Sequence, residues 1–79
     1  MSTEPNGVVA SIPVVRVLRC QKTHRYLASN GWSDDAESAK NFAHGIDAVR
    51  DCVSRNLVEI DLVLRVRGGS ADLFCMRLR

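Results

Sequence analysis

The strongest constraint on the fold is the pattern of residues 58–79, which predicts a β-hairpin. Two runs, 58–67 and 71–79, alternate apolar and polar side chains over much of their length, and Gly68-Gly69-Ser70 separates them. Alternation with a period of two is typical of a strand with one buried face, and a short glycine-containing segment between two such runs favours a tight turn. We therefore expect two antiparallel strands joined by a loop.

The loop length determines which side chains face each other in this hairpin. A three-residue loop at 68–70 sets Arg67 opposite Ala71 and keeps apolar and charged residues on separate faces. A two-residue loop at 69–70 shifts every pair by one residue and mixes the faces. Because opposite charges directly across a ladder are stabilising, we predict the first register. Its pairs are Ile60 with Leu78, Leu62 with Met76, Leu64 with Phe74, Glu59 with Arg79 and Asp61 with Arg77.

Two further strands are expected before the hairpin. Residues 11–20 are rich in β-branched side chains, which favour strands, and residues 25–29 are a second, shorter candidate. Asn30-Gly31 is a turn signal that follows the second strand. We expect Trp32 to lie in the core, because the chain has only three other aromatic residues.

One main helix is expected between the two pairs of strands. Asp34 and Glu37 have the spacing of a capping box, which predicts a short helix near residues 35–40. The longer helix is expected at residues 45–56, where apolar residues recur at helical spacing. Its predicted buried face is Ile46, Val49, Cys52, Val53 and Leu57.

These elements predict a two-layer α+β domain in ββαββ order, with a mostly antiparallel four-stranded sheet packed on one main helix. Residues 11–79 are expected to form a single small domain, since 79 residues are enough for one domain and no second. Residues 1–10 have no periodicity and are expected to be a flexible tail. The order of the strands in the sheet does not follow from the pattern.

The charged residues include many arginines but leave little net charge. Nine of the eleven positive residues are arginine, and the formal net charge is +2. Arginine suits carboxylate, phosphate and protein interfaces better than lysine does, although GC-rich coding DNA gives the same bias without any function. No apolar stretch approaches the roughly 20 residues that cross a bilayer, and a signal peptide is not recognisable. We expect a soluble, cytoplasmic protein without a membrane partner.

The usual residue patterns of metal, cofactor and catalytic sites are missing from the sequence. Cys20, Cys52 and Cys75 are widely spaced, and neither His24 nor His44 lies at metal-ligand spacing from them. A glycine elbow that would present a nucleophile is also missing. We therefore expect no metal, no cofactor and no enzymatic activity.

The face of the hairpin away from the helix is the first candidate for a functional surface. Its centre is apolar and its rim is charged, which is the anatomy of a protein interface. We expect it to bind a protein partner or a second copy of the chain, as a binding or regulatory module. The alternative is an ordinary solvated face, because single exposed apolar residues are common. The candidate interface residues are Val63, Arg65, Leu73 and Cys75.

Nucleic-acid binding is the second candidate function. Basic residues on the strands offer contacts to the phosphates of RNA or single-stranded DNA. Proteins of this class normally add aromatic platforms for the bases, and only Tyr26 and Trp32 are available here. The candidate contacts are Arg16, Arg19, Lys22, Arg25, Arg65 and Arg67.

Overall fold

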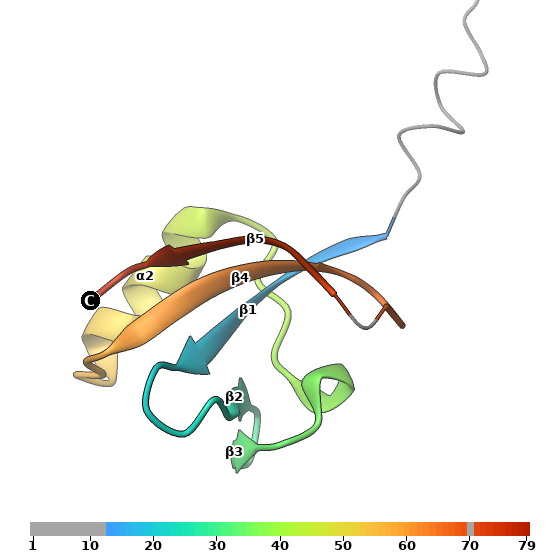
Figure 1. The fold of residues 1–79 in the computed structure, drawn as a ribbon. Helices are drawn as coiled ribbons and strands as arrows, with labels where there is room; N and C mark the ends of the chain where they lie inside the picture. The colour runs from blue at the N-terminus through green and yellow to red at the C-terminus, as the bar shows by residue number, and fades with distance from the viewer. Residues whose placement is uncertain (1–12, 70) are drawn as a thin grey trace, which may run out of the picture.

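The computed structural model describes residues 13–69 and 71–79, which form an antiparallel sheet with a helix on one face (Figure 1). The predicted α+β class is confirmed, while the predicted tail at residues 1–10 lies outside the described residues. The elements are β1 (Val14–Cys20), β2 (Tyr26–Ala28), β3 (Gly31–Ser33), the 3-10 helix η1 (Ala36–Ser38), α2 (Gly45–Ser54), β4 (Ile60–Val66) and β5 (Asp72–Arg77).

The five strands lie in the order β3-β2-β1-β4-β5, and all neighbouring pairs are antiparallel. The two hairpins meet through β1 and β4, which pair along seven residues from Val14 opposite Val66 to Cys20 opposite Ile60. The short strand β3 adds a fifth strand to the four predicted. It forms because the chain turns back after Ala28 and pairs again at Gly31, whose φ of 125° favours glycine.

The predicted register of the β4–β5 hairpin is confirmed in its middle and wrong near the turn. Four consecutive pairs, from Asp61 opposite Arg77 to Leu64 opposite Phe74, are those that the alternation predicts. Arg65 then pairs with Asp72, so that Leu73 is an extra residue in β5, a β-bulge. The bulge brings the Asp72 carboxylate to the Arg65 guanidinium, 2.7 Å away.

Two charge pairs predicted across this hairpin are replaced by other partners. Glu59 has a φ of 56° and precedes β4, and its carboxylate lies 3.3 Å from the Lys22 ammonium instead of meeting Arg79. Asp61 does lie opposite Arg77, but its carboxylate accepts a hydrogen bond from Nε2 of Gln21 at 2.9 Å. Within residues 13–69 and 71–79, no ion pair joins Asp61 to Arg77. The register therefore depends more on the apolar pairs than on the charges.

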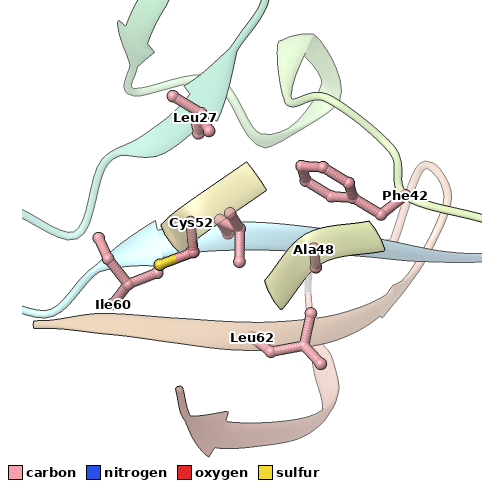
Figure 2. Close-up of a cluster of buried hydrophobic side chains, with 7 residues drawn as sticks. Leu27, Phe42, Ala48, Cys52, Ile60 and Leu62 are labelled. Carbon is pink, nitrogen blue, oxygen red and sulfur yellow. The ribbon is translucent and has the colours of Figure 1, made fainter. Parts of the chain in front are cut away.

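The helix α2 contacts the sheet through its smaller apolar residues. Ala48 and Cys52 are fully buried, one helical turn apart, and they pack over β1 and β4 (Figure 2). The predicted buried face of this helix is therefore wrong at three positions. The small side chains of Ala48 and Cys52 let the helix lie close to the sheet, and in this orientation the larger apolar residues point away from the sheet. The exposed three are Ile46, Val49 and Val53. The core consists of Leu18, Leu27, Phe42, Ala48, Cys52, Ile60 and Leu62, with Cys20, Leu57 and Leu78 packed against it.

The opposite face of the sheet is also covered, although no α-helix of the described residues 13–69 and 71–79 lies on it. Val17 and Val63 are directly opposed on this face, and both are almost completely buried. Val17 lies beside Ala36 and Ala39 of the η1 region, around a small cleft. The segment that contains β2, β3 and η1 therefore curls over the face that the sequence analysis expects to be open.

Two smaller expectations are also corrected. Trp32 is exposed rather than in the core, because β3 is an edge strand. The first helix is only the three-residue η1, and its cap is Asp35, not Asp34: Asp35 Oδ1 accepts a hydrogen bond from the Glu37 amide at 3.0 Å. In the part of the chain that the structure describes, no helix has the length and apolar character to cross a membrane.

The orientation of α2 predicts how the helix tolerates larger side chains. Ala48→Leu adds volume at a fully buried contact and should lower the free energy of unfolding by about 1–3 kcal/mol. The matched control Val49→Leu, at the exposed neighbour, should change it by less than about 0.5 kcal/mol. Urea unfolding of both variants measures the difference. A neutral Ala48→Leu together with a destabilising Val49→Leu would show that the helix is rotated differently.

Candidate protein-binding surface

The four interface residues predicted from the sequence do not form one exposed patch. Val63 is fully buried and Arg65 is 7% exposed, so the expectation that they are open to a partner is wrong. The cause is the β2–η1 segment, which covers their face. Leu73 and Cys75 are exposed, and both belong to β5. Whether these two residues meet a partner stays a prediction.

Arg65 instead has a structural role at the bulge. Its Nη1 donates to Asp72 at 2.7 Å and to the Tyr26 hydroxyl at 3.3 Å, and its Nη2 donates to the Gly69 carbonyl at 2.9 Å. Arg19 Nη1 donates to the other oxygen of Asp72 at 2.9 Å. One carboxylate therefore binds two guanidinium groups and connects β5 with β1 and β4. Hydrogen bonds between charged groups are among the strongest in proteins.

The six residues proposed for nucleic-acid contacts are not gathered into a groove. Arg19 and Arg65 meet at Asp72, and they share its negative charge. Lys22 pairs with Glu59, and Arg25 pairs with Asp34 at 3.1 Å. Arg16 donates to the carbonyl of Ala43 at 2.9 Å. Only Arg67, of the six, has an exposed side chain without an ion pair in the described residues. These contacts weaken the electrostatic case for binding phosphates, and the hypothesis itself stays a prediction.

The sequence analysis predicts the strand β5 but misses that it is an edge of the sheet. It lies at one edge of the sheet and pairs on one side with β4, and the described residues place no strand on its other side. All six of its residues are exposed. On the face that carries α2, Phe74 is 52% exposed and Met76 is 44% exposed. An uncovered, apolar edge strand is a template for pairing with another chain.

The helix α2 adds an apolar flank on the same side of the sheet. Ile46, Val49 and Val53 lie three and four residues apart and so share one side of the helix. The polar side of α2 borders the segment 40–43. This segment runs along β1, at the edge of β1 that does not pair with β4. The apolar flank is therefore turned toward β4 and β5. We call the exposed residues of the two elements the α2–β5 surface: Ile46, Val49, Val53, Phe74 and Met76.

Two clefts in the described residues lie apart from the α2–β5 surface. An open cleft of about 420 Å³ lies between the segment 40–43 and the polar side of α2. A smaller one of about 180 Å³ is lined by Cys20, Trp32 and Leu57 among others. In the described residues no group of three or more His, Cys, Asp or Glu side chains is placed to hold a metal ion. The larger cleft is lined by Lys40, Asp51 and Ser54 among others, and the Asp51 carboxylate pairs there with Lys40 at 3.7 Å and with Arg55 at 3.0 Å.

The three free thiols differ in their surroundings. A hydrogen bond from the Thr23 hydroxyl lowers the pKa of Cys20. Partial desolvation of the thiol and the nearby Asp61 carboxylate raise the pKa of Cys75, whose thiol donates to Asp61 at 3.5 Å and accepts from Arg19 at 3.4 Å. Burial also raises the pKa of Cys52. Cys20 therefore has the largest fraction of thiolate at neutral pH.

Comparison with known proteins adds no relative to this picture. No protein-family model matches the sequence, and no curated protein or solved structure matches it. The functional inference therefore depends on the α2–β5 surface and on the internal contacts of the charged residues.

The double contact of Asp72 predicts a selective loss of stability. Asp72→Asn removes the negative charge between Arg19 and Arg65 and leaves the buried Arg65 without its counter-charge. We expect the free energy of unfolding to fall by about 1–3 kcal/mol. The control is Asp34→Asn at the exposed pair with Arg25, where the loss should stay below about 1 kcal/mol. Equal losses in urea unfolding would contradict the structural role of Asp72.

The thiol environments predict an order of alkylation. At pH 7.5 iodoacetamide should modify Cys20 faster than Cys75, and Cys52 should react last because it is buried. Thr23→Val should slow the reaction at Cys20, while Thr23→Ser keeps the hydroxyl and should not. The effect of Thr23→Val should vanish at high pH, where the thiol is ionised in both proteins. Peptide mass spectrometry measures the rates, and a persistent effect at high pH would point to access rather than pKa.

Proposed function

We propose that this protein is a non-enzymatic protein-binding module, whose partner binds along the edge of β5 and against the apolar flank of α2. The observation that carries the proposal is the exposure of the whole of β5, with Phe74 and Met76 on the face of α2. Proteins normally cover, charge or shorten such an edge. The binding site therefore differs from the one that the sequence analysis expects, although it keeps Leu73 and Cys75.

The backbone of β5 supports the addition of a strand. The amide of Leu78 donates to the Ile60 carbonyl at 2.8 Å, so it points toward β4. Amides alternate in direction along a strand, so those of Met76 and Phe74 also point toward β4, and those of Cys75 and Arg77 point to the free edge. A partner strand can thus form main-chain hydrogen bonds at Cys75 and Arg77.

The side chains on the α2 face add a hydrophobic contribution to this pairing. A strand beside β5 covers Phe74 and Met76 and lies next to the flank of Ile46, Val49 and Val53. Burying apolar surface contributes about 25 cal/mol per Å² before the costs of association are subtracted. The main chain then supplies the alignment, while the apolar side chains supply most of the favourable free energy.

The setting that we propose for the module is the cytoplasm. Cys20, Cys52 and Cys75 are free thiols, which suits a reducing compartment. In the larger cleft the Asp51 carboxylate is already paired with Lys40 and Arg55, and the smaller cleft is lined mainly by apolar side chains, which supports a binding role over catalysis.

Photo-crosslinking in the cells that express the protein tests the proposed function. A benzophenone amino acid in place of Phe74 should give protein adducts. The same residue in place of Val58 should give none, because Val58 lies off the α2–β5 surface. Val58 is a matched control since its exposure, 59%, is similar to the 52% of Phe74. Met76→Glu should abolish the adducts and, at an exposed site, should change the free energy of unfolding by less than about 1 kcal/mol.

Three other outcomes would contradict the proposal. Equal adducts at positions 74 and 58 would mean that contact is unspecific. Adducts at neither position would mean that the surface has no partner. Adducts with RNA or DNA in place of protein would favour the nucleic-acid hypothesis, and mutation of Arg67 should then reduce them.

A further inference from the structure

We infer that the partner on the β5 edge is a second copy of this chain, bound antiparallel across a two-fold axis that passes between the two Cys75 residues. This inference rests on the proposed function above and names its partner. The paired copies would form one continuous ten-stranded sheet, since each contributes a five-stranded sheet. A two-fold axis perpendicular to the sheet keeps both α2 helices on the same face.

The free main-chain groups of β5 fit this arrangement. Cys75 and Arg77 direct their amides and carbonyls to the open edge, as deduced from the Leu78–Ile60 hydrogen bond. With the axis at Cys75, the two Cys75 residues form the central hydrogen-bonded pair. Arg77 of each copy then lies opposite Leu73 of the other, where the bulge ends the regular strand.

The side chains are complementary in the same register. On the face that carries α2, Phe74 of each copy lies opposite Met76 of the other, so all four apolar side chains are covered. Contacts between a methionine sulfur and an aromatic ring are favourable. The apolar flanks of both α2 helices border this cluster, and they extend it on either side.

The charged ends of β5 favour antiparallel over parallel pairing as well. The strand begins with Asp72, whose carboxylate already binds Arg19 and Arg65 of its own chain, and it ends with the basic Arg77. Antiparallel pairing places the two Arg77 residues at opposite ends of the paired strands, whereas parallel pairing in register would place them side by side, where like charges repel.

Registers shifted by two residues are less complementary. With the axis at Phe74, Met76 lies opposite Asp72 of the other copy. With the axis at Met76, both Arg77 residues come close to the centre, where like charges repel. The axis at Cys75 is the register that matches apolar with apolar and separates like charges.

Cysteine crosslinking tests the inference, because Cys75 reports directly on the proposed axis. The variant Cys20→Ser retains Cys75 and the fully buried Cys52, so a short bismaleimide reacts at Cys75. Treated at pH 8, where its raised pKa matters less, the variant should give a covalent dimer. The control has Cys20→Ser, Cys75→Ser and Val58→Cys, which moves the exposed thiol away from the axis, and it should give no covalent dimer although it still associates.

Sedimentation velocity over a range of concentrations measures the equilibrium itself. The unmodified protein should sediment as a dimer at high concentration and dissociate on dilution. Met76→Glu should raise the dissociation constant at least about tenfold, equivalent to about 1.4 kcal/mol. The exchange of Phe74→Met with Met76→Phe keeps each opposed pair intact across the two-fold axis, and this double variant should still dimerise. Loss of the dimer in the double variant would overturn the register.

The outcomes distinguish a failure of this inference from a failure of the proposed function. A protein that stays monomeric at every concentration, with fast hydrogen exchange at the Cys75 and Arg77 amides, overturns self-pairing and leaves the edge open for another protein. A monomer in which these two amides exchange slowly overturns both proposals, because the chain then covers its own edge. A dimer unaffected by Met76→Glu uses another surface and also overturns the inference.

Discussion

The pairing of β1 with β4 is the interaction on which the rest of the structure depends. Seven residue pairs join the two hairpins at the centre of the sheet, and both faces of this pair are buried. Leu18 and Leu62 face α2, whereas Val17 and Val63 face the segment around η1. Because the contacting strands lie far apart in the sequence, the central ladder forms only at the cost of closing a long loop. The outer strands can then add to an edge that already exists.

A helix of ten residues covers two strands but not a third. The close contact of Ala48 and Cys52 centres α2 over β1 and β4, and β5 extends beyond the region that the helix shields. On the opposite face, the ion pairs of Asp72 with Arg19 and Arg65 fix the start of β5. The strand is thus held in place on one side by electrostatic contacts, while its apolar side chains remain open on the other.

The sequence predicts those parts of the fold that depend on local alternation. The α+β class and the middle of the β4–β5 register follow from apolar residues spaced by two, such as Leu62 and Leu64. The bulge at Leu73 does not follow, because the contact of Arg65 with Asp72 that accompanies it depends on tertiary geometry. Helical spacing alone also could not decide whether Ala48 or Val53 faces the core. For the same reason the candidate site was predictable only in part, as Val63 is buried by a segment that is distant in the sequence.

The contacts around β5 link the local stability of this strand to its association with a partner. None of its six residues is buried, so its order depends on the ladder with β4 and on the ion pairs of Asp72. A strand held in this way opens locally with a smaller free energy than the core requires. A partner that binds the free edge of β5 also suppresses the local opening of this strand. The ordering of β5 and its association with the partner are therefore one linked equilibrium. The melting temperature of a chain that pairs with itself in this way must therefore rise with its own concentration.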